Sequence, residues 1–329
     1  MTQMVSSLRC DVQRIPAAAW LVGAVALLLW AARVEALQMQ QTASSALEQR
    51  IEHEANVIHA GERAGLEPLK LGRLWAHIAT EYEDEAEFSK SEDAYNRALK
   101  LLRPAPEGAT SYAIVLDNLG SLYLATGNLN AAEGCRKQAM ALHEAAGDRL
   151  QIARSESLLA EVSLARHKFK DAEQQSMEAY REMVAVKDAA TGEMVGALVT
   201  LTYASCMNRH CAEGVEHGRE AILLAHEAFA ANSLPMGEAR MALGYAEWKA
   251  GMKDDADGEM REGIEILKEW RTPGHPYVLG AMDQYRKYLD ETHHKREAQQ
   301  IAEEEKRLQG APSASCANCT VSVYGLRGR

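Results

Sequence analysis

The feature that most constrains this chain is an internal repeat with a period of about 40 residues. Similar helical segments recur along the sequence, and one small position within them returns every 40 to 42 residues. That position is occupied by Ala98, Ala139, Ala179, Ala221 and Gly263, and the same phase continues to Glu305. A fixed period of this length is typical of solenoids, because one short unit cannot bury its own apolar face and must stack on its neighbours.

Each unit of the repeat contains two helical patterns. In the first, leucines three positions apart precede a small residue and then an aromatic one, as in residues 116–123. In the second, small residues recur seven positions apart, as at Ala132 and Ala139. Seven residues are two helical turns, so these small side chains share one face, where a neighbouring helix can approach closely. The sequence therefore predicts an all-α solenoid of antiparallel helix pairs over residues 68–308.

Prolines and glycines mark the boundaries of the predicted helices. Six of the eight prolines fall between the second helix of one unit and the first helix of the next, namely Pro68, Pro104, Pro106, Pro235, Pro273 and Pro276. Proline is tolerated in linkers and first turns but breaks a helix interior. Gly127 and Gly251 stand where the first helix of a unit must turn into the second, which favours a left-handed cap.

These residues resemble the tetratricopeptide repeat family, in the variety of roughly 42 residues found in kinesin light chains and in many bacterial proteins. The resemblance covers about residues 69–308 and is strongest in the second and fifth of six units. It implies a right-handed superhelix in which the first helix of each unit lines the concave side. It also implies that the chain is not an enzyme but a scaffold that binds a peptide or another protein.

The family register places an apolar stripe on the concave side of the central units, formed by Val199, Tyr203, Cys206, Met207, Met241, Tyr245 and Trp248. Tyr, Trp and Met are enriched in interface cores, so the stripe is a candidate peptide-binding surface. Packing against the adjacent unit is an equally good explanation of the same residues. Asn118 is a further candidate, because it alone keeps the asparagine with which kinesin light chains hold the backbone of a ligand.

The sequence offers no pattern of an active site. It lacks a phosphate-binding GxxxxGK[ST] loop, GxGxxG, HExxH and GxSxG, so we expect neither catalysis nor a cofactor. The formal net charge is −11, from 36 basic and 47 acidic residues. This excess of carboxylates argues against a nucleic-acid partner, since phosphate binding needs clustered Lys and Arg.

The N-terminus predicts export from the cytoplasm. Residues 15–32 are uncharged and apolar, and they follow Arg9 and Arg14. About 18 such residues just span a bilayer, so residues 1–36 are either a cleaved signal peptide or a transmembrane signal anchor. In both cases the basic flank stays inside, and the repeats are expected to be periplasmic, secreted or anchored outside the membrane. Residues 37–67 then read as an N-terminal cap helix and a linker.

The cysteines do not form a disulfide framework. Cys206 and Cys211 straddle the turn of the fourth unit, where we expect two small buried residues rather than a disulfide. Cys316 and Cys319 form a CxxC in a flexible tail over residues 309–329. The tail supports an alternative function, in which the chain is an accessory redox or metal-binding module. Self-association through the repeats is a third possibility.

Overall fold

The computed structural model describes residues 49, 51, 53–103, 108–186, 191–272 and 274–309. The chain divides into two compact units, residues 1–54 and residues 55–329, and the repeats belong to the second unit. The predicted apolar helix at residues 15–32 and the Cys316/Cys319 tail lie outside the described residues. Within the described ranges, no helix combines the length and the apolar character needed to cross a membrane.

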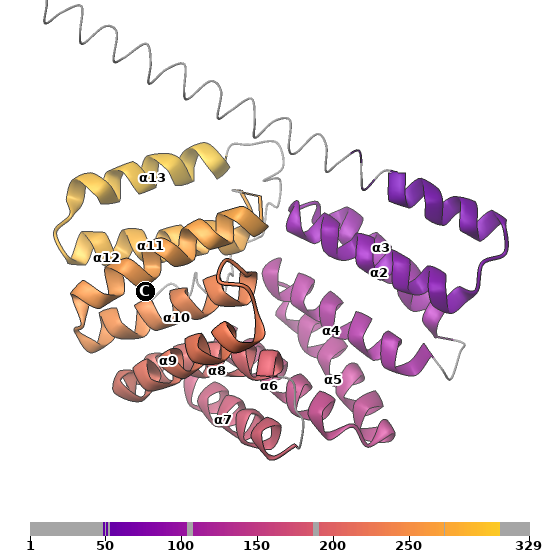
Figure 1. The fold of residues 1–329 in the computed structure, drawn as a ribbon, viewed down its shortest axis with the longest axis horizontal. Coiled ribbons are helices and arrows are strands. Elements are labelled where there is room, and N and C mark those ends of the chain that lie inside the picture. The colour runs from indigo at the N-terminus through magenta and orange to yellow at the C-terminus, as the bar shows by residue number, and fades with distance from the viewer. Residues whose placement is uncertain are drawn as a thin grey trace, which may run out of the picture. The chain divides into compact units, whose positions relative to one another are not determined.

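Between residues 68 and 309, the described residues form twelve helices in six consecutive pairs (Figure 1). The pairs are α2 (Pro68–Asp84) with α3 (Phe88–Leu102), α4 (Ala109–Ala125) with α5 (Leu129–Ala146), α6 (Arg149–Ala165) with α7 (Phe169–Ala185), α8 (Thr191–Met207) with α9 (Cys211–Ala228), α10 (Leu234–Ala250) with α11 (Lys253–Trp270), and α12 (Pro276–Glu291) with α13 (Lys295–Gln309). The described residues contain no strand, so the predicted all-α solenoid is confirmed.

The first helix of each pair, here called the A helix, lies on the inner side of the stack. Each A helix contacts the A helix of the next unit, most extensively where α8 meets α6 and α10. The second helix of each pair, the B helix, has its main contacts with the A helix before it and the A helix after it. The A helices of successive units thus pack on one another along the stack, whereas each B helix contacts mainly A helices. The faces of the A helices that point away from the B helices form the inner surface of the repeats.

The predicted small residues lie where helices cross. Ala132, Ala139 and Ala256 are fully buried. A Cβ added at Gly244 would lie 2.7 Å from Cγ of Met260 and 3.2 Å from the carbonyl oxygen of Ala256. The A and B helices of the fifth unit therefore approach each other too closely for any side chain at this position.

Each A helix is followed by a left-handed residue at the same repeat position. Gly127 (φ 79°) and Gly251 (φ 89°) occupy this position in the second and fifth units, as predicted. In the other four units the residue carries a side chain, namely Ala86 (φ 59°), His167 (φ 61°), Arg209 (φ 73°) and His293 (φ 67°). The turn is therefore set by the geometry of the helix pair, and residues that disfavour the left-handed region accept it there.

The starts of the helices are fixed by prolines and capping side chains. Pro68, Pro235 and Pro276 lie in the first turns of α2, α10 and α12, as the sequence predicts. Asn128 and Ser233 are N-caps whose side chains accept hydrogen bonds from backbone N–H groups in the first turn. These prolines and capping residues therefore place the starts of the four helices where the repeat register predicts them.

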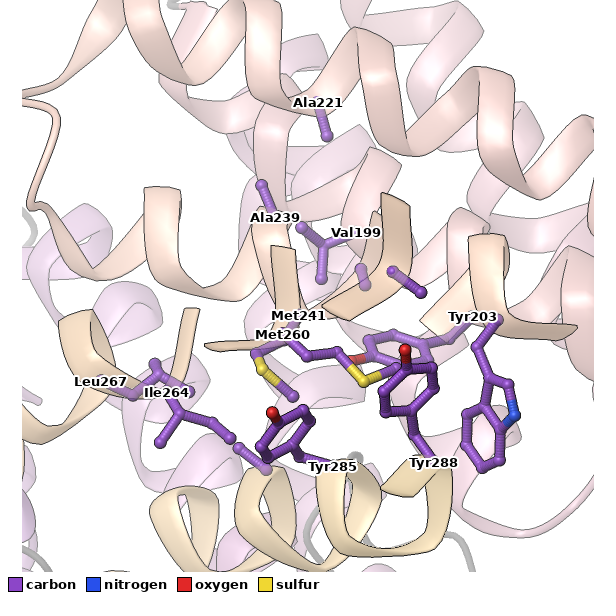
Figure 2. Close-up of a cluster of buried hydrophobic side chains, with 14 of the residues drawn as sticks. Val199, Tyr203, Ala221, Ala239, Met241, Met260, Ile264, Leu267, Tyr285 and Tyr288 are labelled. Atoms are coloured by element: carbon purple, nitrogen blue, oxygen red, sulfur yellow. The ribbon is translucent and has the colours of Figure 1, made fainter. Parts of the chain in front are cut away.

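The largest apolar cluster runs through the third to sixth units (Figure 2). Helix α8 lies at its centre, and from Val195 to Cys206 every residue of α8 except Gly196 is buried. Side chains of α10, α11 and α12 contribute to the same cluster, including Met241, Ile264 and Tyr285. A helix buried on all its faces leaves little of the inner surface of these units open to solvent.

Candidate binding surface

The predicted apolar stripe is one connected group in the structure, and most of it is buried. Val199, Tyr203, Met241 and Trp248 retain 9%, 2%, 0% and 5% of their exposure, and all four belong to the large apolar cluster. Met207 and Tyr245 are partly exposed. The four buried side chains therefore serve packing between the units. Of the remaining stripe residues, Met207 and Tyr245 are exposed enough to touch a partner in this conformation.

Aromatic rings join the stripe to the last unit. The ring centroids of Tyr203 and Tyr245 are 5.3 Å apart, those of Tyr245 and Trp248 are 5.9 Å apart, and those of Trp248 and Tyr288 are 6.1 Å apart. Tyr288 comes from α12 and belongs to the same apolar cluster as Tyr203 and Met241 (Figure 2). The sixth unit thus covers the side of the stripe that would otherwise face a ligand.

Asn118 and Cys206 complete the set of residues that the sequence predicts for this surface. Asn118 is half-buried on α4 of the second unit, so the structure does not bring it into the stripe of the fourth and fifth units. Cys206 and Cys211 form a disulfide, and the expectation of two buried free thiols is wrong. The physical reason is the tight turn after α8, which brings the two Cα atoms to 4.0 Å from each other.

A buried polar network lies between the second and third units. Arg136 of α5 is completely buried, and its Nη2 donates to Glu161 Oε2 at 2.8 Å and to Ser121 Oγ at 3.3 Å. Asp117 of α4 is 1% exposed, and its Oδ2 lies 3.6 Å from Nε2 of His143. Burial raises the pKa of Asp117. Arg136 stands on a B helix whose pattern predicts a solvated charge, so the sequence did not single it out.

Arg271, in the segment between α11 and α12, is the centre of a second polar cluster. Its Nη1 lies 2.8 Å from Oδ1 of Asp84, and its guanidinium lies 5.3 Å from the ring centroid of Tyr277. Glu83, which is 6% exposed, accepts a hydrogen bond from the Tyr95 hydroxyl at 3.3 Å. Burial raises the pKa of Glu83 to about 7, although Arg271 opposes this shift. His275 is fully buried, and its burial holds its pKa well below the usual range.

Charged groups from several units converge on this inner side. Glu238 of α10 is partly exposed, yet desolvation raises its pKa to about 7, with Arg271 lowering it and Glu161 adding to the increase. Burial raises the pKa of Tyr277 as well, and the charge of Glu161 contributes. Glu161, Glu238 and Arg271 belong to the third unit, the fifth unit and the segment before the sixth. Their influence on one another's pKa values indicates that these charged groups of the inner side lie within electrostatic range of each other.

Elsewhere, a pocket of about 480 Å³ lies along α6 and α7 and is lined mainly by charged side chains, namely Arg149, Glu156, Glu178, Arg181 and Glu182, with Ile152 and Ala153. Its charges are partly paired, since Arg149 Nη2 lies 2.7 Å from Glu182 Oε2. Burial raises the pKa of Glu156, and the neighbouring Glu178 and Glu182 add to this increase. A mixed, largely solvated set of charges of this kind contains no nucleophile with an adjacent base.

Comparison with known proteins identifies the fold. No family model and no curated protein matches the chain. Among solved structures, a Rap protein complexed with competence and sporulation factor is 13% identical, with a TM-score of 0.55 over 73% of this chain and 75% of that one. The apo form of RapI is also 13% identical, with a TM-score of 0.54 over 72% of this chain and 82% of that one.

A third solved structure is BtubC from P. vanneervenii, which is 16% identical, with a TM-score of 0.53 over 68% of this chain and 92% of that one. Identities this low are evidence about the fold alone. The shared architecture agrees with the repeat period, the small-residue positions and the left-handed turns described above. The chain therefore has the tetratricopeptide-type repeat fold.

Proposed function

We propose that this protein is a non-catalytic scaffold that binds a segment of another protein on the inner surface formed by its A helices. The observation that carries the proposal is the state of Glu238. The residue is partly exposed, desolvation raises the pKa of its carboxyl group to about 7, and it has no hydrogen bond or ion pair with any other described residue. A desolvated carboxylate without a partner gains most from an incoming positive charge.

The neighbouring charges favour a ligand that carries Lys or Arg. Glu83, Glu161 and Glu238 contribute carboxylates to this side, whereas the cations Arg136 and Arg271 are already engaged with Glu161 and Asp84. A basic side chain of a partner would complete the pairing at Glu238, and the partly exposed Tyr245 and Met207 would contact apolar groups beside it. The complex of a Rap protein with competence and sporulation factor supports binding by this type of fold.

The test compares two isosteric substitutions. Partners are crosslinked in native membranes or culture fractions and identified by mass spectrometry, with the wild-type chain, Glu238→Gln and Glu216→Gln. Glu216 is an exposed carboxylate on α9, on a B helix, and serves as the matched control. We expect Glu238→Gln to lower the recovery of the main partner at least tenfold while thermal unfolding is unchanged or higher. Equal recovery with both variants would contradict the proposal.

We further propose that the repeats lie outside the cytoplasm, exported by residues 1–36 and attached to the membrane if that segment is not cleaved. The Cys206–Cys211 disulfide supports this compartment, because structural disulfides persist mainly in oxidising environments. Carbonate extraction and N-terminal sequencing of the native protein distinguish an anchor from a cleaved signal. Recovery of the reduced, full-length chain from the cytosol would contradict export.

Deleting residues 309–329 separates the scaffold from the alternative function of the Cys316/Cys319 tail. Under our proposal, partner recovery survives the deletion. If deleting residues 309–329 abolished partner recovery while Glu238→Gln recovered the partner as well as the wild type, the tail would be favoured as the functional part.

A further inference from the structure

The first unit is in contact with a segment that precedes the last unit. The Thr272 N–H donates to the carbonyl oxygen of Asp84 at 3.2 Å, and the Thr272 hydroxyl reaches the same oxygen at 3.4 Å. Arg271 adds its ion pair with Asp84, and the ring of Phe88 lies 5.6 Å from that of His275. Stacking of consecutive repeats produces contacts between neighbouring units only, so this contact across the stack is an additional feature.

The contact is small and polar, unlike the contacts between consecutive units. The fourth, fifth and sixth units share one continuous apolar cluster, in which α8 is buried on nearly all of its faces. Among the described residues, the contact includes the Asp84–Arg271 ion pair, the two hydrogen bonds from Thr272 to Asp84, a hydrogen bond between the His275 ring and the Glu83 backbone, and the ring pair of Phe88 and His275. Breaking it leaves the apolar stacking of the units intact. It can therefore open without unfolding the repeats.

Several of its groups are held in an unfavourable environment. Burial raises the pKa of Asp84 even though Arg271 is its ion partner, and it raises the pKa of Glu83 beside it. Nε of Arg271 is buried and has no hydrogen-bond partner among the described residues. Opening the contact would return all three groups to water, which offsets much of what the ion pair contributes.

We propose that the Asp84–Arg271 contact is a releasable latch, which holds the first unit against the segment before the last unit and controls access of a protein ligand to the inner surface. That the Asp84–Arg271 contact opens is inferred from its small, polar contacts and from the cost of burying its charged groups. Only the control of access rests on the proposed function, because it requires a ligand that binds between the A helices.

Hydrogen exchange of the Thr272 amide tests the opening without any ligand. This N–H is bonded only across the latch, so its exchange reports opening directly. In the full-length protein we expect it to exchange at least tenfold faster than the amides inside α10, and Arg271→Gln should accelerate it at least tenfold more. Arg240→Gln is the matched control, because Arg240 is similarly buried but pairs with Glu259 inside the fifth unit. Exchange of Thr272 at the rate of global unfolding would overturn the latch.

A reversible crosslink tests the control of access. The double variant Asp84→Cys/Thr272→Cys places two thiols at the latch, and we expect its oxidised form to recover the crosslinked partner at least tenfold less well than its reduced form. The single variants and the wild type, each with and without reductant, control for Cys206 and Cys211. Equal recovery from the locked and reduced forms, with Glu238→Gln still defective, would overturn the control of access while leaving the proposed function in place. Fast exchange of Thr272 with no partner for any variant would instead contradict the proposed function alone.

Discussion

The side chain of Trp248 contacts four different residues. Its ring packs edge-on against Tyr245 and Tyr288, its Nε1 donates to Glu291 Oε2 at 2.9 Å, and the ammonium of Lys249 lies 3.3 Å from a ring centroid. Only 5% of the residue remains exposed. All of these contacts are made within the chain, and Tyr288 and Glu291 belong to the sixth unit. Trp248 therefore stabilises the junction of the fifth and sixth units.

Replacing Trp248 with Ala should therefore destabilise the fold. Removing a buried aromatic side chain typically costs about 3–5 kcal/mol of unfolding free energy, because the lost contacts leave a cavity. Lys249→Ala is the control, and it should cost less than about 1 kcal/mol because its ammonium is partly solvated. Urea denaturation followed by circular dichroism measures both. Full stability of Trp248→Ala together with lost partner binding would instead identify the ring as a contact for the ligand.

Glu83 gives the fold a dependence on pH that can be measured. Its pKa is raised from 4.5 to about 7 by burial, so the folded state disfavours the ionised carboxylate. Its contribution to stability is complete below pH 4.5 and is lost as the pH rises through 7. Glu83→Gln removes this loss, and at pH 8 we expect the variant to be more stable than the wild type by up to about 3 kcal/mol.

The comparison is made by denaturant unfolding between pH 5 and pH 8. The advantage of Glu83→Gln should shrink steadily toward pH 5. Glu144→Gln, at an exposed position on α5, should follow the wild type at every pH. A wild-type protein that is more stable than Glu83→Gln at pH 8 would show that the ionised carboxylate is stabilised in the fold.

At the level of the helix pair, one turn conformation is used six times with very different residues. Gly127 and Gly251 adopt the left-handed region freely, whereas Arg209 and His293 adopt it at a cost, because their Cβ approaches the following carbonyl. Glycine was the only signal for this turn in the sequence. The four turns without glycine could not be predicted from local residues, since the packing of the two helices imposes them.

This cost predicts that Arg209→Gly stabilises the protein. Relief of the left-handed strain should raise the unfolding free energy by about 0.5–1 kcal/mol, after the greater entropy of glycine in the unfolded chain is taken into account. Arg209→Ala is the matched control, because it removes the same side chain but keeps the Cβ, and it should bring no gain. Thermal unfolding of the oxidised proteins measures the difference. Equal midpoints for both variants would show that the turn carries no strain.

The same comparison shows which parts of the binding surface the sequence could predict. Small residues, prolines and the A-helix stripe follow from the repeat register, and the structure does bring Tyr203, Tyr245 and Trp248 together. The burial of Tyr203 and Trp248 was not predictable, because it depends on Tyr288 and Tyr285 of a sixth unit in which Arg286 replaces the usual small residue. Arg136 and Arg271 were missed because their ion-pair partners are far away in the sequence, and Glu238 because the charges that act on it, Arg271 and Glu161, are equally distant.

For the whole molecule, the repeat period predicts which units stack but not how far the stack curves. Curvature results from small rotations at every interface, and no single residue encodes it. The rotations at all the interfaces together bring Asp84 into contact with Arg271 and Thr272. Asp84 and Thr272 are 188 positions apart in the sequence. This contact places Arg271 within electrostatic range of Glu83, Asp84 and Glu238.

Site-specific photo-crosslinking in the native cell tests most directly whether the inner side of the repeats is the binding surface. A photo-reactive amino acid is placed at Thr80 and Tyr245 on A helices, and at the exposed Gln138 and Gln299 on B helices as controls. We predict the same protein adduct from both A-helix positions and none from the B-helix positions, with the adducts lost in Glu238→Gln. Adducts from Gln138 and Gln299 alone would place the partner on the outer side and contradict the account.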